Sequence, residues 1–193
     1  MRYIVPCGLA MMACLILTGC AGPAKKPVEA QEGELSEYVD EVNGFSILIP
    51  STWEEPPREQ LEAAAKKLPP NVKMLLSIRA PDRWIYMTVI AEKLEKAITA
   101  NEYCDMIVSN FEKKPARQAK VLGREALTVD GNPAVKYSLS TVNDKGKPIK
   151  RVAIVLVRDS TAWSVTVAGN AKFVDQSSDL IEKCLASLIF KKQ

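Results

Sequence analysis

Histidine is absent from the 193 residues of this chain. Its absence excludes the Ser-His-Asp and Cys-His catalytic arrangements, the usual zinc sites and haem ligation by imidazole. The sequence also lacks a glycine-rich phosphate-binding loop, a Cys-x-x-Cys pair and an EF-hand loop, since its nine glycines are scattered through turns. We therefore expect no metal and no other cofactor.

Charge of one sign is not concentrated in any long run. The formal net charge is +3, and the missing basic run argues against nucleic acid as a partner. Hydrophobic residues make up 47% and charged residues 25% of the chain, as in ordinary globular proteins. The chain is long enough for one domain with a proper core.

The first 20 residues carry the most specific signal. An apolar run from residue 4 to residue 17 is too short to span a bilayer comfortably, but it has the size of the hydrophobic part of an export signal. The run ends in Leu17-Thr18-Gly19-Cys20, which resembles the lipobox of bacterial lipoproteins at all four positions. This resemblance implies cleavage between Gly19 and Cys20, diacylglycerol on the Cys20 sulfur and a further acyl chain, such as palmitate, on its amino group.

Two alternatives are open for this segment: an ordinary signal peptide whose cysteine is accidental, and an uncleaved transmembrane anchor. The anchor is disfavoured by the short apolar run and by the lack of a basic stop-transfer cluster after it. Ala21 and Gly22 follow the cysteine, with no aspartate at the second position. That pattern resembles the default outer-membrane destination of Gram-negative lipoproteins. We therefore expect a lipid-anchored protein of the bacterial cell envelope, at the outer membrane with its domain in the periplasm.

The rest of the chain divides into a tether and one domain. Residues 1–19 are the expected lipoprotein signal peptide. Residues 20–37 are expected to form the lipidated N-terminus and a disordered tether, because they combine few apolar side chains with prolines and alternating charges. Residues 38–190 are expected to form a single α+β domain.

Apolar periodicity and turn residues predict the elements of that domain. Strands are expected at 38–42, 45–49, 72–79, 84–94, 120–129, 133–142, 148–157 and 162–169, and helices at 57–68, 99–114 and 174–188. Asn43-Gly44 and Asp130-Gly131 predict tight hairpins, and short gaps permit only antiparallel neighbours. Thr99 and Glu102 have the spacing of a helix capping box.

Four stretches carry a resemblance to a known family. They are Gly44-Phe45-Ser46-Ile47, Pro50-Ser51-Thr52-Trp53, Gly131-Asn132-Pro133-Ala134 and Ser187-Leu188-Ile189-Phe190. Together with the element order they resemble the PsbP-like superfamily, which includes bacterial DcrB-like envelope proteins, the PsbP subunit of photosystem II and a Ran-binding nuclear-import factor. The resemblance implies an antiparallel sheet of about six to eight strands flanked by helices, and non-catalytic docking or assembly roles. It supplies no catalytic residues.

Two cysteines remain in the expected domain, Cys104 and Cys184. Each falls on the apolar face of its own expected helix. They are either two buried thiols that act as small hydrophobic side chains, or a disulfide in an oxidising compartment. The disulfide requires neighbouring helices, with Cα atoms within about 7 Å of each other.

Other candidate site residues each have a plain structural alternative. Trp53, Trp84 and Trp163 could line an apolar ligand pocket or a docking surface, but strands also favour tryptophan for packing. Glu54 and Glu55 could act as a catalytic carboxylate couple, although their place before two prolines suits a solvated turn.

A basic series could contact lipid headgroups or an acidic partner. Its members are Lys113, Lys114, Arg117, Lys120 and Arg124. The alternative is the solvated end of a helix followed by a strand edge.

The first functional hypothesis is a non-catalytic binding or assembly module that is tethered to the membrane by its N-terminal lipid and docks onto an envelope protein. The second is a carrier of a small apolar ligand. The third is a carboxylate-based hydrolase, which requires two acids that converge in a cleft.

Overall fold

The computed structural model describes residues 34–81 and 84–191. The expected signal peptide, Cys20 and the greater part of the expected tether lie outside the described residues. The elements, in order, are β1 (Leu35–Asp40), β2 (Phe45–Pro50), α1 (Arg58–Ala65), β3 (Val72–Arg79), β4 (Ile85–Lys93), α2 (Ala100–Glu112), the short 3-10 helix η1 (Pro115–Arg117), β5 (Lys120–Val129), β6 (Asn132–Val142), β7 (Pro148–Arg158), β8 (Thr161–Asn170), α3 (Ala171–Gln176), α4 (Ser178–Ala186) and β9 (Ile189–Phe190).

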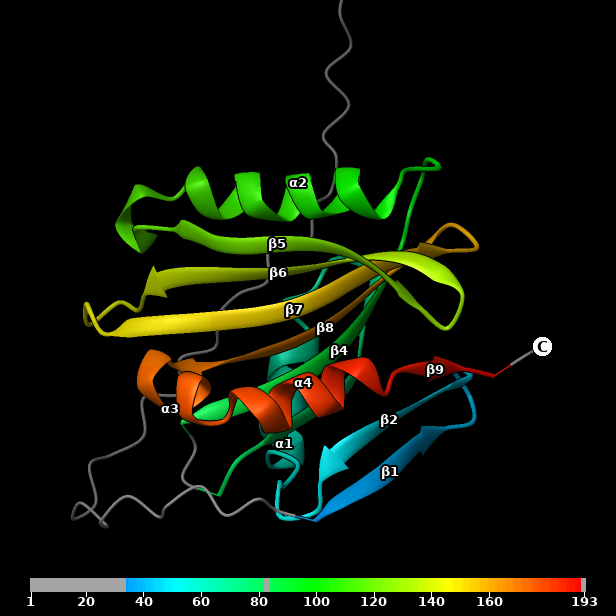
Figure 1. Cartoon of the computed structure of the whole chain (residues 1–193), viewed down its shortest axis with the longest axis horizontal. Coiled ribbons are helices and arrows are strands. Elements are labelled where there is room, and N and C mark those ends of the chain that lie inside the picture. The colour runs from blue at the N-terminus through cyan, green and yellow to red at the C-terminus, as the bar shows by residue number, and fades with distance from the viewer. Residues whose placement is uncertain (1–33, 82–83, 192–193) are drawn as a thin grey trace, which may run out of the picture.

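A six-stranded antiparallel sheet forms the centre of the fold (Figure 1). Its strand order is β3-β4-β8-β7-β6-β5, and strands β5 to β8 follow one another as hairpins, as the turn residues predict. Gly131 and Gly146 lie in two of these turns with φ of +76° and +70°, a conformation that glycine adopts without steric cost. The meander of the C-terminal half is therefore confirmed.

A second, three-stranded sheet has the order β1-β2-β9. Its hairpin is confirmed, although β1 begins at Leu35, three residues before the first strand that the sequence predicts. The connecting loop is longer than the two-residue Asn43-Gly44 turn. The Asp40 carboxylate closes it by accepting hydrogen bonds from the backbone N–H of Asn43 at 2.9 Å and from its side-chain amide at 2.7 Å.

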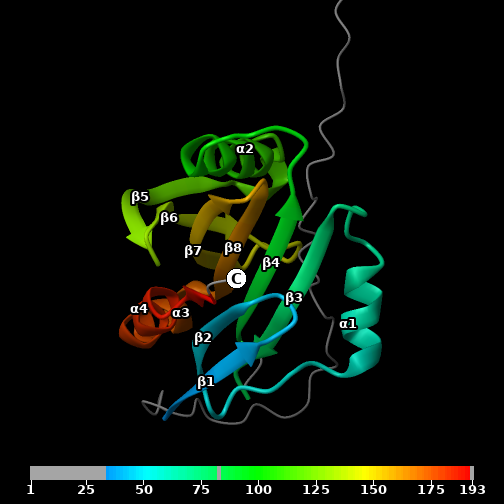
Figure 2. The ribbon, with the colours of Figure 1, turned by 90° about the vertical axis from the view of Figure 1, so that its right-hand side faces the viewer.

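The larger apolar core lies between the two sheets and against α3 and α4 (Figure 2). Trp163 of β8 packs edge-on against two aromatic rings of the small sheet, with centroid distances of 5.7 Å to Phe45 and 4.9 Å to Phe190. Both phenylalanines are buried, so strands β2 and β9 are joined to β8 through one aromatic cluster.

The other face of the large sheet is covered by α2. The expected capping box is present: Thr99 Oγ1 accepts from the Glu102 N–H at 3.1 Å, and the Glu102 carboxylate accepts from the Thr99 N–H at 2.7 Å. Tyr103 and Cys104 are buried beneath the helix against β6 and β7. Antiparallel sheets with helices on both faces confirm the α+β class.

One expected helix, 174–188, is wrong in its bounds. Two helices, α3 and α4, replace it, with a break at Ser177, whose φ of −101° and ψ of 16° leave the helical region. Ser and Asp near this position compete for backbone hydrogen bonds and weaken a continuous helix. The burial of Ile181, Cys184 and Leu185 is as predicted.

The backbone of β8 lies unusually close to the chain at the start of β4. A Cβ atom on Gly169 of β8 would lie 2.0 Å from the carbonyl oxygen of Trp84, so no larger residue fits there without displacing the backbone. The Asn170 N–H donates to the same carbonyl at 3.0 Å. No helix among the described residues is long and apolar enough to cross a membrane.

Candidate functional site

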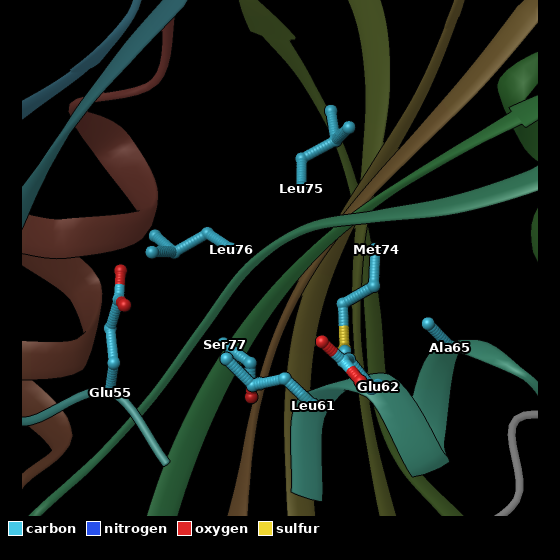
Figure 3. Close-up of a pocket in the computed structure, with 8 residues that line it drawn as sticks. All are labelled: Glu55, Leu61, Glu62, Ala65, Met74, Leu75, Leu76 and Ser77. Carbon is cyan, nitrogen blue, oxygen red and sulfur yellow. The ribbon is translucent and has the colours of Figure 1, made fainter. Parts of the chain in front are cut away.

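An open groove of about 230 Å³ lies between α1 and strand β3, at one edge of the large sheet (Figure 3). Figure 3 shows side chains of α1 pointing toward side chains of β3 across this groove. Its lining residues are Glu55, Leu61, Glu62, Ala65, Met74, Leu75, Leu76 and Ser77.

Loose packing of α1 produces the groove. The helix has no fully buried residue, and Leu61 is half-buried where it faces the strand. In β3, Met74 pairs with Ile90 and Leu76 with Val89, so Leu75 is an extra, bulged residue. A bulge bends its strand and breaks the strict alternation of side chains. Consecutive apolar residues therefore line the same groove.

The groove combines an apolar floor with an acidic rim. Glu55 and Glu62 are both exposed, and Glu62 accepts a hydrogen bond from Arg58 one helical turn away at 2.8 Å. A general acid needs burial or a close like charge to keep its proton near neutral pH, and neither carboxylate is buried. The arrangement suits an apolar side chain next to a basic group better than acid–base chemistry.

The Glu54-Glu55 couple is not brought together. The backbone of Glu54 pairs with Arg79 through two hydrogen bonds of 2.9 Å, while Glu55 turns toward the groove. Both side chains are exposed at a turn before the prolines. The two glutamates therefore match the alternative given above, in which they belong to a solvated turn and not to a catalytic couple.

The structure does not gather the three tryptophans into one pocket. Trp163 belongs to the aromatic core, and Trp53 is half-buried against the same core. Trp84 is 45% exposed and stacks on Phe173 with centroids 5.7 Å apart. Trp163 pairs with Ala91 of β4, and Ala91 is seven residues from Trp84, so the backbones of the two tryptophans are roughly 20 Å apart along the sheet. None of the three lines the groove.

A second hollow of about 190 Å³ lies where β2 meets the end of α4, and no tryptophan lines it either. Its lining residues are Glu37, Ser46, Ile47, Leu48, Ser187 and Ile189. The Ser187 hydroxyl accepts from the Leu48 N–H at 2.8 Å and donates to the Cys184 carbonyl at 2.6 Å. This hydroxyl therefore ties the helix end to the small sheet.

The disulfide between Cys104 and Cys184 is not formed. Both cysteines are free and buried, and they belong to the two separate apolar clusters on opposite faces of the large sheet. The sheet lies between α2 and α4, so their cysteines cannot meet. Burial raises the pKa of the Cys104 thiol, and it raises the pKa of the Cys184 thiol to about 11. Both act as small hydrophobic side chains.

One buried acid was not identified from the sequence. Glu92 of β4 is 6% exposed and accepts hydrogen bonds from the Tyr103 hydroxyl at 2.8 Å and from the Asn71 amide at 3.3 Å. Burial raises the pKa of Glu92, although both hydrogen bonds oppose the shift. Burial and the neighbouring carboxylate raise the pKa of Tyr103 as well. The pair lies outside both hollows and joins β4 to α2. The sequence indicated the burial of Glu92 only through its place in β4, where alternate residues face the interior.

The basic series divides in two. Lys113, Lys114, Arg117 and Lys120 lie at one end of the large sheet, where α2 ends and β5 begins. Arg124 instead turns back along α2, pairs with Asp105 and donates to the backbone carbonyl of Asn101 at 2.9 Å.

Within the described part of the chain, no three acids or cysteines are grouped so that they could hold a metal ion. The residues that the sequence analysis missed are those of the groove, above all Leu61, Met74 and Leu75. A bulge in an edge strand has no clear sequence signal, because it depends on how the neighbouring strand pairs.

The family model described as PsbP matches residues 33–190 of the chain. No curated protein matches the sequence.

Several solved structures share the fold. Cyanobacterial PsbP (CyanoP) from Synechocystis sp. PCC 6803 is 18% identical, with a TM-score of 0.58 over 88% of this chain and 99% of that chain. LpqN, involved in cell envelope biogenesis of Mycobacterium tuberculosis, is 13% identical, with a TM-score of 0.54 over 82% of this chain and 91% of that chain. The Ran-binding protein Mog1p of Saccharomyces cerevisiae is 8% identical, with a TM-score of 0.52 over 82% of this chain and 96% of that chain. At such identities the likeness concerns the fold alone.

Proposed function

Because this chain belongs to the PsbP family, we propose that it is a non-catalytic docking module of the bacterial cell envelope, held at a membrane by lipid on Cys20. The module binds another envelope protein and brings it to the membrane surface. The sequence Ala21-Gly22 after the lipidated cysteine supports the periplasmic face of the outer membrane as its location.

The observation that carries the docking role is the form of the groove between α1 and β3. It is open to solvent, has an apolar floor and an acidic rim, and lies beside an edge strand. A carrier of a small apolar ligand instead needs a cavity that encloses most of the ligand. An open groove suits one or two side chains of a protein partner, with a basic residue near the rim.

The relatives support the same proposal at the level of fold. LpqN is described as involved in cell envelope biogenesis, and Mog1p is described as Ran-binding. Neither description names a catalytic activity. Since a shared fold does not transmit a partner, the identity of the partner has to come from experiment.

Replacement of Cys20 tests the anchor. We expect the wild-type protein to partition with membranes after cell lysis, and the Cys20→Ser variant to lose its diacylglycerol and acyl chains. Each buried methylene contributes about 0.8 kcal/mol, so two or three acyl chains make release negligible. Mass spectrometry of the N-terminal peptide identifies the modification. A wild-type protein with an unmodified N-terminus would refute the anchor.

Photo-crosslinking in living cells tests the docking role. A photoreactive amino acid at Ala65 faces the groove, whereas the same amino acid at Ala63 of α1 is exposed but does not line the groove. We expect one reproducible protein adduct from position 65 and none of that mass from position 63. Identical adducts from both positions, or no adduct from position 65, would count against the groove as the docking site.

A further inference from the structure

The two ends of the large sheet differ in charge. At one end β5 and β7 begin, β6 and β8 end, and the last turn of α2 and the first turn of α3 lie beside them (Figure 1). We call this the basic end, made of residues 111–120, 143–151 and 170–175. It contains nine lysines or arginines and three acids. The segments of the opposite end, 38–44, 66–73, 92–102, 128–132, 157–161 and 188–191, contain seven acids and seven basic residues.

Ion pairs neutralise part of the basic end. Arg117 pairs with Asp144 at 3.4 Å, and Lys150 pairs with Asp175 at 2.5 Å. Six further lysines are exposed and make no ion pair within the described residues. They are Lys113, Lys114, Lys120, Lys145, Lys147 and Lys172. The end of α2, the start of β5, the β6–β7 turn and the start of α3 therefore present these ammonium groups to solvent.

An exposed aromatic pair lies within this basic end. Trp84 stacks on Phe173 of α3, and the Lys147 ammonium lies 6.0 Å from the centre of the indole ring. The indole is 45% exposed. A tryptophan beside lysines is the composition of a surface that enters the headgroup region of a bilayer, where an amphipathic ring is stable.

The first described residue lies beside the end of β2. The carbonyl of Glu34, the first described residue, accepts from the Ser51 N–H at 2.8 Å. Three residues after Ser51, Glu54 pairs with Arg79, which ends β3 at the basic end. Strand β1 then runs toward the opposite end of the large sheet (Figure 1). The described part of the chain therefore begins near the edge of the large sheet where β3 ends.

We propose that the basic end, with Trp84 at its rim, rests on the anionic phospholipid headgroups of the membrane that holds the tether. The inference rests on the proposed anchor at Cys20 and adds an orientation to it: the lysines of the basic end face the bilayer, and the opposite end of the sheet faces the periplasm. Glu54 and Glu55 lie beside the point where the chain enters the domain. Anionic headgroups repel them, so the domain tilts onto the lysine side.

Lysine reactivity on defined vesicles tests the orientation. The full lipidated protein is reconstituted in vesicles of phosphatidylcholine alone, or with about a third phosphatidylglycerol to supply negative surface charge. A membrane-impermeant amine reagent then labels exposed lysines, and mass spectrometry quantifies each position. Lys66, Lys67, Lys73 and Lys183 are exposed, lie outside the basic end and serve as internal references.

We expect the six lysines of the basic end to lose reactivity roughly threefold or more on anionic vesicles, while the reference lysines do not change. Salt at about 0.5 M should restore their reactivity, because it screens charges beyond roughly 5 Å. The Lys145→Glu/Lys147→Glu variant should lose the protection of the other four lysines. The matched Lys66→Glu/Lys67→Glu variant has the same net charge and should keep it.

Other outcomes separate this inference from the anchor. A protein that floats with neutral vesicles, with equal lysine reactivity on both vesicle types, would overturn the orientation and leave the anchor intact. A protein that floats with anionic vesicles alone, with its lysines protected, would support the orientation and refute the anchor. Flotation with neither type would overturn both. Protection in native membranes but not on protein-free anionic vesicles would replace lipid with an acidic protein as the occupant.

Discussion

The two faces of the six-stranded sheet differ in the kinds of side chain that they bury. Between the sheets, the core is apolar, and Phe45, Met87 and Leu156 are completely buried there. Beneath and beside α2, the opposite face also buries polar side chains. These are Thr88, Glu92, Thr141, Arg151, Ser164 and Thr166.

The two faces of the sheet therefore stabilise the fold in different ways. The apolar face supplies non-directional stabilisation, which depends on filled volume and hardly on pH. The α2 face depends on specific partners, such as the Tyr103 hydroxyl on Glu92 and the 3.2 Å contact between the hydroxyls of Ser164 and Thr166. A buried polar group on this face lowers the stability of the fold when its hydrogen-bond partner is removed. We therefore expect large, pH-independent losses on one face and smaller, pH-dependent changes on the other.

The largest effect is expected on the apolar face. Leu185→Ala removes a side chain that is 0% exposed and leaves a cavity, so unfolding free energy should fall by about 2–5 kcal/mol. Leu122→Ala removes the same atoms from a side chain that is 48% exposed and should cost well under about 1 kcal/mol. Urea denaturation measures both. Equal losses would show that the apolar cluster is not the main source of stability.

An intermediate effect is expected from Tyr103→Phe on the α2 face. The substitution leaves the buried Glu92 carboxylate with the 3.3 Å Asn71 contact as its remaining described hydrogen bond, at a cost of about 1–3 kcal/mol at neutral pH. Adding Glu92→Gln should recover part of the loss, because a neutral amide costs less to bury than a charge. If the double variant is less stable than the single one, the carboxylate is not the group that needs the hydroxyl.

A smaller effect is expected in the pH dependence, with opposite signs for two acids. Burial raises the folded-state pKa of Glu92, so the wild-type protein loses stability relative to Glu92→Gln as pH rises from 4.5 through the raised value. The Thr99 N–H, and then its hydroxyl, lower the pKa of Glu102. Glu102 therefore stabilises the fold above pH 4.5, and this contribution disappears as pH falls. Denaturation of the two Gln variants across acidic pH should give opposite trends, and parallel trends would contradict the assignment.

The smallest effect is expected from reduction of thiols. Since Cys104 and Cys184 are free on opposite faces, a reductant should not change the urea midpoint. Iodoacetamide should modify both thiols at one rate, set by unfolding, because burial raises both pKa values and blocks access. A midpoint that falls on reduction would mean that a disulfide forms in solution.

Local patterns predicted much of the fold. The strands from β3 to β8 lie close to their expected bounds, because each has an apolar alternation and ends at a turn residue. Thr99 and Glu102 identified the start of α2, since a capping box is local in sequence. The resemblance to PsbP-like proteins predicted the fold class.

Long-range packing decided the rest. No sequence pattern indicates that Ile189-Phe190 pairs with β2, because a two-residue strand has no periodicity. The positions of the cysteines followed from which sheet face each helix covers, and this was not encoded in either helix. The groove depends on the bulge at Leu75 and on the loose packing of α1, and Glu92 was overlooked because a buried acid requires partners from elsewhere in the chain.

Because Phe190 pairs with Phe45 and packs on Trp163, the core cannot close until strand β9 has left the ribosome. Contacts of such sequence separation form late in folding. A chain that is still being synthesised therefore keeps these aromatic residues uncovered, and they give holdase chaperones a surface to bind.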